Sequence, residues 1–449
     1  MKHHNLLKWA FIACLFTLAI FTSCKDDDAG PSDKFTSEYS SEVVTEWMGL
    51  LLKLSKENPG FTPPVAARAF GYTGLTLYES VRGGMPGYRT LAGQVNGLTA
   101  GTIPTAENKA YHWGAVANAA LATVVRACYS NASAANLAAI DSIEAHFADH
   151  VFKSEATQEI LNRSIAYGKS VGDALVTYAA SDGQAMCFAT NFPESYVPPV
   201  GDGLWIPTPP AFQRALQPTW GGVRPFLAKN VTETQPPAPP AYSTDPASQF
   251  WIETMEVYNT VQNLTAEQLI IAEFWADDPG KTFTPPGHSI SILKQILEDE
   301  NADLAIAAEA FAKLGMGVHD AFISCWKAKY DYNLIRPISL IQDKIDPGFT
   351  IPLTTPPFPE YTSGHSVQSG ASAQILTGLF GPNYAFSDRT HANRTDINGT
   401  PRSFASFDAF AEEAAISRLY GGIHYRAAIE EGVKQGKEIG KNINALNFK

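Results

Sequence analysis

Three short clusters of polar residues between Lys329 and His424 are the part of this chain best suited to chemistry. In order, they are Lys329 with Arg336-Pro337, the segment Pro359–His365, and Ser417-Arg418 with His424. They supply three cations, one hydroxyl, one glycine amide and two imidazoles, from Lys329, Arg336, Arg418, Ser363, Gly364, His365 and His424. This combination predicts a site that holds a tetrahedral or trigonal-bipyramidal oxyanion.

The charge of an oxyanion explains why the cations matter. A buried anion needs nearby cations, because burying an unpaired charge is costly. Arg336 and Arg418 can each present a planar fork of N–H donors, whereas a lysine acts as a point charge. Ser363 can donate a hydrogen bond, and Gly364 lets a backbone N–H approach closely. One histidine can then bond to the central atom while the other acts as acid or base.

The spacing of these residues indicates which elements must position them. Lys329 and Arg336 are seven residues apart, so we expect them on one face of a helix that ends near Pro337. Arg418 and His424 are six residues apart, which does not place them on one face of an ideal helix. The Gly421-Gly422 pair between them therefore predicts a break that brings the two side chains together.

In the content and order of these clusters, the chain resembles the vanadium-dependent haloperoxidases, which share an active site with the type 2 phosphatidic acid phosphatase superfamily. The resemblance implies that His424 is the axial ligand of vanadium in vanadate, or the nucleophile of a phosphatase. It implies that His365 is the acid–base residue that helps peroxide to bind, and that Lys329 polarises the peroxide. It also implies that the oxyanion is held by Lys329, Arg336, Ser363, Gly364, Arg418 and His424.

The same resemblance singles out further positions. Trp326 and Phe358 fall where chloride-using fungal enzymes of the family carry a tryptophan and a phenylalanine near the halide. Asp278 matches the acid that orients the acid–base histidine, although the neighbouring Asp277 fits nearly as well.

The chain departs from the family pattern at Ala428. The family has an aspartate there, and in the phosphatases it orients the nucleophilic histidine. Its absence counts against efficient phosphatase activity, unless Glu430, Glu431 or a backbone carbonyl serves instead. His288 and His391 belong to no recognisable constellation in the sequence.

The start of the chain predicts export and lipid anchoring. An apolar run from Trp9 to Phe21 follows two lysines, is short for a spanning helix, and leads to Ser23-Cys24. This resembles a bacterial lipoprotein signal peptide at residues 1–24 with lipidation at Cys24, and an ordinary cleaved signal or membrane anchor is the alternative. Lys25–Asp28 resembles a surface-export signal of some Gram-negative lipoproteins. We therefore expect a lipid-anchored protein of the bacterial cell envelope, at the outer membrane, with the lipid as its only membrane contact.

The rest of the chain has the pattern of a mostly helical globular protein. Its 449 residues are 45% hydrophobic, and stretches rich in Ala and Leu carry apolar residues at helical spacing. We expect an all-α fold with two packed helical bundles. The expected segments are a flexible tether at 25–36, an N-terminal bundle at 37–183, a proline-rich connecting segment at 184–245, and a C-terminal bundle at 246–449 that carries the site.

A weak internal echo supports two related halves. The same residue types recur at the same offsets in Ala69-Phe70, Gly74, Leu77 and Glu79 and in Ala310-Phe311, Gly315, Val318 and Asp320. Ala-rich helices resemble one another, so the echo alone does not prove a repeat.

The net charge of −12 disfavours nucleic acid as a partner. The leading expectation is a vanadium-dependent haloperoxidase-like enzyme that oxidises halide with hydrogen peroxide on a His-bound vanadate, with halide or a small organic molecule as substrate. One alternative is a soluble acid phosphatase of the same superfamily, which would use a phosphohistidine intermediate and hold phosphate in the same site. Another is a non-catalytic, surface-binding lipoprotein. The sequence fixes neither the halide nor the oligomeric state.

Overall fold

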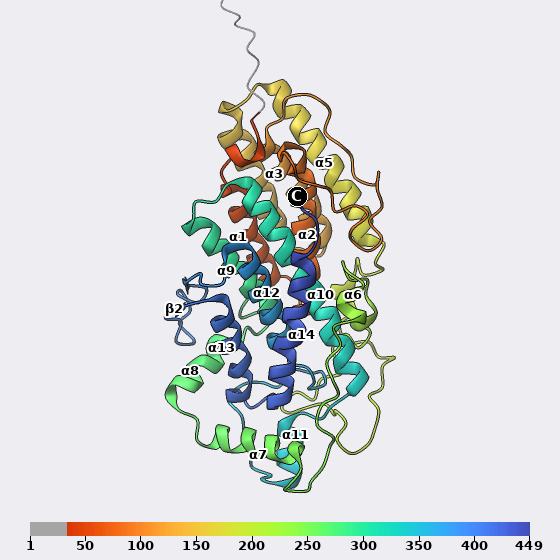
Figure 1. Ribbon diagram of the computed structural model, residues 1–449, viewed down its shortest axis with the longest axis vertical. Coiled ribbons are helices and arrows are strands. Elements are labelled where there is room, and N and C mark those ends of the chain that lie inside the picture. The colour runs from red at the N-terminus through yellow and green to blue at the C-terminus, as the bar shows by residue number, and fades with distance from the viewer. Residues whose placement is uncertain (1–33) are drawn as a thin grey trace, which may run out of the picture. The chain divides into compact units, whose positions relative to one another are not determined.

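Helices make up most of residues 34–449, which are the residues that the computed structural model describes (Figure 1). The expected signal peptide at 1–24, Cys24 and the tether up to residue 33 lie outside the described residues. The helices are α1 (Glu42–Glu57), α2 (Pro63–Val81), α3 (Trp113–Cys128), α4 (Ala134–His146), α5 (Gln158–Ala180), α6 (Lys229–Thr232), α7 (Gln249–Gln262), α8 (Ala266–Phe274), α9 (Thr284–Asp299), α10 (Leu304–Tyr332), α11 (Pro337–Lys344), α12 (Gly364–Phe380), α13 (Phe407–Tyr420) and α14 (Arg426–Asn444).

The starts of the helices follow from local chemistry. α2 begins at Pro63, and α9 has Pro285 in its first turn, where the missing N–H of proline costs nothing. The Asp303 side chain caps α10 by accepting from the Ile306 amide. Ser363 caps α12 in the same way, and thereby fixes the start of the helix that carries Gly364 and His365.

Helices α2 and α10 form the central pair of the fold, and they meet at the echoed residues. A Cβ atom at Gly74 would lie 2.5 Å from the Phe311 carbonyl oxygen. A Cβ atom at Gly315 would lie 2.5 Å from the Phe70 carbonyl oxygen. The two backbones therefore approach closely at equivalent glycines, which gives the echo a structural basis.

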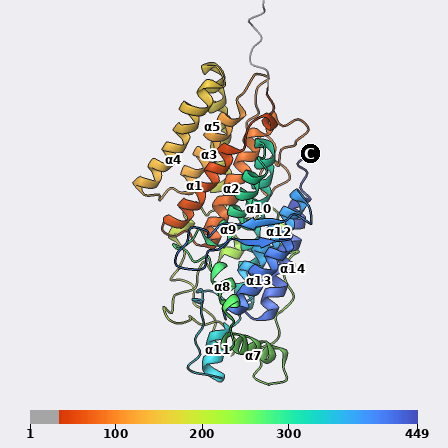
Figure 2. The same ribbon diagram turned by 90° about the vertical axis from the view of Figure 1, so that its left-hand side faces the viewer.

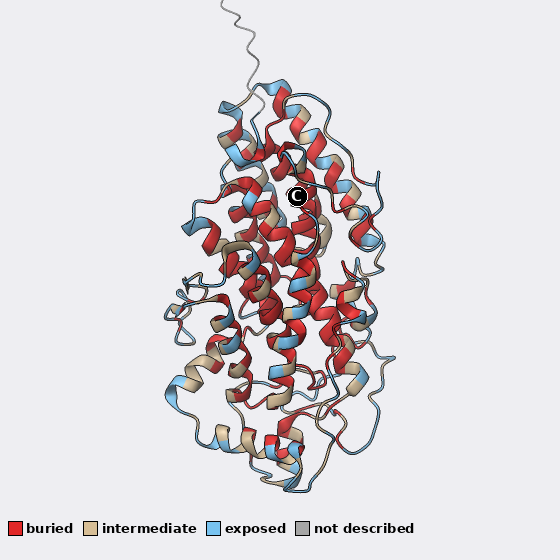
Figure 3. Cartoon of the chain, viewed as in Figure 1, coloured by how far each residue is buried: buried red, intermediate tan, exposed pale blue. Residues whose placement is uncertain are grey.

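The remaining helices pack in two groups around this pair (Figure 2). α3 and α5 pack on each other and on α2, whereas α12 packs on α10, α13 and α14. α9 contacts α1, α2, α10 and α12, so it joins the two groups. Buried residues run through both groups as one apolar core (Figure 3). The expected all-α fold with two helical bundles is confirmed, while the segment boundaries at 183 and 245 stay a prediction.

The proline-rich segment 184–245 contains no helix longer than the four residues of α6. It is nevertheless held firmly against α10. The carboxylate of Asp320 accepts hydrogen bonds from the backbone amides of Phe226 and Leu227 at 2.7 and 2.9 Å. Trp205 and Trp220 from this segment are buried. The segment is thus a packed part of the fold.

The expectation that Lys329 and Arg336 share one helix is wrong. Helix α10 ends at Tyr332, because Asn333 adopts a left-handed conformation with φ of 46°. Arg336 precedes α11, and Pro337 begins that helix instead of ending one. The turn at Asn333 lets α10 and the start of α11 approach the site from different directions.

Two short antiparallel strands, β1 (Phe386–Asp388) and β2 (Arg402–Phe404), pair Phe386 with Phe404 between α12 and α13. Of the helices in the described residues, none combines the length and apolarity that a bilayer span requires.

Candidate active site

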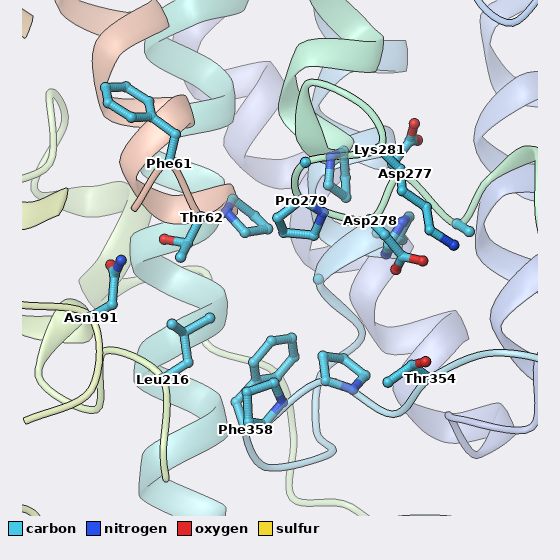
Figure 4. Close-up of a pocket in the computed structure, with 18 of the residues that line it drawn as sticks. Phe61, Thr62, Asn191, Leu216, Asp277, Asp278, Pro279, Lys281, Thr354 and Phe358 are labelled. Atoms are coloured by element: carbon cyan, nitrogen blue, oxygen red, sulfur yellow. The ribbon is translucent and has the colours of Figure 1, made fainter. Parts of the chain in front are cut away.

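A cavity of about 680 Å³ has His365, Arg418 and His424 in its wall. Its other walls come from the α1–α2 loop, the connecting segment, the loop before α9, α10 and residues 354–358. Figure 4 shows Phe61 and Asn191 on one side of the cavity and Asp278 and Lys281 on the other. The cavity therefore joins the second and third sequence clusters to segments from both halves of the chain.

His424 lies in the loop between α13 and α14 and is held in one orientation by Glu360. Its Nδ1 lies 2.8 Å from the Glu360 Oε1 atom. Because a carboxylate accepts a hydrogen bond, this contact places the ring proton on Nδ1 and leaves the lone pair on Nε2. Burial lowers the pKa of His424 well below its usual range, and Arg336 lowers it further. The histidine is thus a neutral ligand or nucleophile with a defined reactive nitrogen.

Glu360 supplies the carboxylate that the sequence pattern lacks at Ala428. Glu430 pairs with Arg426 and Glu431 with Lys434, so neither of the two acids considered from the sequence serves His424. Glu360 is fully buried, and its Oε1 atom also accepts from the Tyr425 amide at 2.9 Å. Burial raises the pKa of Glu360 to about 7. Its place in the Pro359–His365 cluster was a signal, but the sequence does not show that its side chain reaches His424.

Arg336 and Arg418 bring buried N–H donors that have no protein partner among the described residues. Arg336 donates through Nε to the Phe358 carbonyl and through Nη1 to the Ile423 carbonyl, and Nη1 lies 3.3 Å from His424 Nε2. Its Nη2 is unpartnered. Arg418 donates through Nη1 to the Trp275 carbonyl at 2.7 Å, while its Nε is unpartnered. Burial lowers the pKa of both guanidinium groups to about 10, so both remain cations at neutral pH.

Lys329 is surrounded by backbone carbonyls. Its ammonium group is fully buried and donates to the carbonyls of Pro359, Glu360 and Thr362. An ammonium group has three hydrogens, so these carbonyls occupy all of them. Burial lowers the pKa of Lys329 to about 7. The structure thus gives Lys329 a role in holding segment 359–362, and its contact with peroxide stays a prediction.

The start of α12 brings Ser363, Gly364 and His365 together. Gly364 and His365 lie in the first turn of the helix and line the cavity, where helix N–H groups favour an anion. Ser363 is fully buried, and its hydroxyl accepts from the Ser366 amide at 3.3 Å. The Nε2 atom of His365 has no partner among the described residues. Burial and Arg418 lower the pKa of His365 well below its usual range, so the ring is neutral and can accept a proton.

Neither aspartate that was matched to the acid behind His365 hydrogen-bonds to that ring in the described structure. Asp278 lines the cavity near Arg418, and burial raises its pKa. Asp277 bonds instead to His288, with 2.7 Å between Oδ2 and Nδ1. The Trp275 carbonyl raises the pKa of His365, against the larger opposing effect of burial. The role of Asp278 as an orienting acid stays a prediction, and the chain turns at Asp277, whose φ is 50°.

His288 and His391 form a buried network that the sequence did not reveal. His288 lies between Asp277 and Asp388, with both N···O distances at 2.7 Å, and its ring stacks on Trp275 at 4.5 Å. These carboxylates raise the pKa of His288 to about 10 despite its burial, so it is a cation. His391 Nε2 lies 3.4 Å from Asp277. The network fixes the turn that aims the Trp275 carbonyl at Arg418 and His365.

Trp326 and Phe358 lie together in the cavity wall, with ring centroids 4.8 Å apart. The Lys329 ammonium and the Arg336 guanidinium lie 4.9 and 5.0 Å from the Phe358 ring. The two aromatic residues thus separate the buried cations from the open part of the cavity. Their place near a halide and their role in halide choice stay predictions.

Buried donors without a partner test whether the site suits an oxyanion. Arg336 Nη2, Arg418 Nε and the first turn of α12 offer hydrogen bonds, and His424 Nε2 offers a lone pair. A buried donor without a partner costs about 1–3 kcal/mol, which a bound anion would offset. Vanadate and phosphate both fit this set of cations, N–H donors and one neutral imidazole.

Comparisons with known proteins agree with this geometry. The family model for the VCPO second helical-bundle domain matches residues 309–447. A vanadium chloroperoxidase from Curvularia inaequalis is 30% identical in an alignment 211 residues long, and the match covers 34% of this chain and 35% of that protein. The match thus spans about a third of the length of that curated relative.

Solved structures match much more of the chain. A structure described as the first bacterial vanadium-dependent iodoperoxidase is 37% identical, with a TM-score of 0.80 and coverage of 90% of this chain and 96% of that one. A holo-type bacterial vanadium-dependent chloroperoxidase is 14% identical, with a TM-score of 0.67 and coverage of 87% and 92%, and shows the fold alone. From these matches and the site, the chain belongs to the vanadium-dependent haloperoxidase family.

Proposed function

We propose that this protein is a haloperoxidase that binds vanadate at His424 and oxidises halide with hydrogen peroxide. The observation that carries the proposal is the hydrogen bond from His424 Nδ1 to Glu360. This bond leaves Nε2 without a proton and facing the Arg336 guanidinium. A nitrogen that binds the central atom of an oxyanion needs such a free lone pair.

The residues of the chain divide the work. Vanadate would supply the Lewis acidity that activates peroxide. Arg336 and Arg418 offset the negative charge and orient the oxygens through their free N–H groups. His365, with a neutral ring and a free Nε2, accepts a proton as peroxide enters the site. Lys329 keeps segment 359–362 in place through its carbonyl contacts.

Iodide is the first halide to test, because the relative matched over 96% of its length is described as an iodoperoxidase. The full chain would be incubated with and without orthovanadate, then given peroxide and one halide at a time, and halogenation of a phenolic dye would be followed. We expect vanadate-dependent activity that disappears in His424→Ala. Absence of halogenation with every halide would overturn the proposal.

A second experiment tests the observation itself. Glu360→Gln keeps the size of the side chain but presents an amide to His424 and weakens the control of its tautomer. We expect the affinity for vanadate to fall about 10- to 100-fold. The control is Glu431→Gln, because Glu431 pairs with Lys434 away from the site. Equal affinities in the two variants would contradict the role given to Glu360.

A phosphatase is the second candidate, and one observation favours it. The absence of an acid at Ala428 counted against phosphatase activity, because the nucleophilic histidine needs a carboxylate to orient it. Glu360 provides such a carboxylate by contacting His424. His424 would attack phosphorus and His365 would protonate the leaving group. Cleavage of a chromogenic phosphate ester without vanadate, inhibited by vanadate and without halogenation, would establish this function. Silence in both assays, with no vanadate binding, would favour a non-catalytic binding protein.

We also propose that the protein is anchored to the bacterial outer membrane through a lipid on Cys24. The support is the sequence pattern that ends at Ser23-Cys24. Labelling of cells with a radioactive fatty acid should mark the protein, and Cys24→Ser should abolish the label. A labelled Cys24→Ser variant would refute the assignment.

A further inference from the structure

The cavity is much larger than a haloperoxidase needs for its inorganic substrates alone. Its volume is about 680 Å³, whereas a water molecule takes about 30 Å³ and peroxide or a halide only a little more. Sites for small organic molecules are about 300–1,000 Å³. The space beside His365 and His424 therefore suits an organic molecule as well as halide and peroxide.

Part of the wall of this extra space is apolar, and charged side chains such as Lys56, Glu57 and Lys281 line other parts of the cavity. Phe61 comes from the α1–α2 loop, Leu216 from the connecting segment, and Phe322 from α10. They continue the surface that Trp326 and Phe358 begin near the reactive groups. Flat apolar walls of this kind favour an aromatic ring.

The same walls hold polar atoms that are ready to bind a hydrogen-bonding group. Within residues 34–449, Asn58 Nδ2 and Thr355 Oγ1 are buried and have no partner, and both residues line the cavity. Phe192 also lines it but is 41% exposed, which places this ring at the mouth. A ligand with an aromatic ring and a polar oxygen would satisfy both kinds of wall.

We propose that the cavity binds an electron-rich aromatic acceptor, a phenol in the simplest case, and that halogenation occurs on the bound acceptor. This inference rests on the proposed haloperoxidase function. The overall step is ArH + X⁻ + H₂O₂ + H⁺ → ArX + 2 H₂O. A ring C–H bond is exchanged for a C–X bond, the halide gives two electrons to peroxide, and the ring proton leaves in water.

The N-terminal half and the connecting segment contribute residues to the proposed acceptor site. Phe61 and Asn58 belong to the α1–α2 loop, and Phe192 belongs to the connecting segment, so none of them comes from the bundle that holds the oxyanion site. The acceptor is therefore bound between the two halves of the fold. Its selectivity depends on segments other than those that oxidise halide.

The test separates halide oxidation from transfer to the acceptor. With the vanadate-loaded full chain, peroxide and iodide, triiodide formation would be measured without an acceptor, and iodination of phenol would be measured against phenol concentration. We expect saturation with phenol and an ortho-to-para product ratio that differs from that of free hypoiodous acid. Phe192→Ala should lower kcat/KM for phenol, and this fold loss should be about ten times the fold loss in the rate of triiodide formation.

A matched control variant completes the experiment. Val200→Ala is the matched control, because Val200 lies in the same segment, is 97% exposed and does not line the cavity. It should change neither rate. Triiodide formation together with unsaturable iodination and the product ratio of free hypoiodous acid would overturn the acceptor site and leave the peroxidase proposal intact. Loss of triiodide formation itself would instead overturn the peroxidase proposal.

Discussion

Helices α2 and α10 occupy equivalent places in the two halves, yet only α10 carries residues to the oxyanion site. Each has a glycine at their crossing and a buried carboxylate further along, Glu79 on α2 and Asp320 on α10. Each carboxylate accepts from backbone amides of another segment. α2 ends at Val81, whereas α10 continues to Tyr332.

The extension of α10 beyond Asp320 is what separates the two helices in function. It carries Trp326 to the cavity and Lys329 to the carbonyls of segment 359–362. The shared part of each helix stabilises the fold, because its polar atoms are used to hold other segments. The two helices thus share their crossing, and the extra length of α10 is what reaches the cavity.

The largest difference between the halves should appear when their arginines are changed. Arg336→Lys keeps the charge but loses the planar fork beside His424, so we expect halide oxidation to fall about 100- to 1,000-fold. Arg82, at the end of α2, forms its salt bridge with Glu79, so Arg82→Lys should change the rate of halide oxidation less than twofold. Steady-state kinetics of both purified variants checks this. Equal losses would mean that the N-terminal half also serves the chemistry.

The glycines at the crossing should respond alike. Gly315→Ala and Gly74→Ala each place a methyl group 2.5 Å from a carbonyl oxygen of the partner helix. We expect each to lower the free energy of unfolding by about 1–3 kcal/mol, measured by urea denaturation. Gly222→Ala is the control, since no atom lies within 4 Å of the added carbon. A neutral result at only one of the two positions would break the equivalence of the helices.

The residues before the two carboxylates, His319 on α10 and Tyr78 on α2, should affect the pH dependence of stability differently. Burial lowers the pKa of His319 on α10 to about 3, whereas an exposed histidine titrates near 6.5. Between these values the unfolded chain binds a proton that the folded chain does not, so stability falls as pH falls. The contribution of His319 to the free energy of unfolding is fully present above pH 6.5. Below that pH it falls by about 1.4 kcal/mol per pH unit.

His319→Gln should remove this slope from the free energy of unfolding between pH 3 and 6.5. Tyr78 stands at the equivalent position of α2 and does not titrate in this range, because burial raises its pKa. Tyr78→Phe should therefore lower stability, through its lost bond to the Arg89 carbonyl, without changing the slope. An unchanged slope in His319→Gln would show that another group causes the acid sensitivity.

The smallest effect should be local opening of the segments that the carboxylates hold. Asp320→Asn replaces an acceptor with an N–H donor, and we expect amide exchange at Phe226 and Leu227 to rise about fivefold, or about 1 kcal/mol. Glu79→Gln should do the same at Leu91. Hydrogen exchange followed by mass spectrometry would detect both. A uniform rise across the chain would instead indicate global destabilisation.

Local sequence patterns predicted the helices well. Stretches with apolar residues at helical spacing are observed as long helices, among them α2 at Pro63–Val81 and α10 at Leu304–Tyr332. Periodicity and proline positions act within a few residues, so they can be read directly. The left-handed turn at Asn333 could not be read in this way, and it overturned the single helix expected for Lys329 and Arg336.

The partners of the site residues were harder to predict, because they come from distant segments. Glu360 and His424 are 64 positions apart, and His288 and Asp388 are 100 apart. Each pair forms only when whole helices pack. The sequence clusters therefore predicted that His365, Arg418 and His424 gather at one site. The hydrogen bonds that set their protonation had to come from the structure.

Segment 359–365 joins two parts of the chemistry in one short piece of backbone. Glu360 sets which nitrogen of His424 is free, and His365, five residues later, carries the ring that we propose as acid and base. A displacement of this segment would alter ligand binding and proton transfer at the same time. Selection cannot easily tune one without the other, so variation among relatives is expected to be tolerated in the distant cavity walls before it is tolerated here.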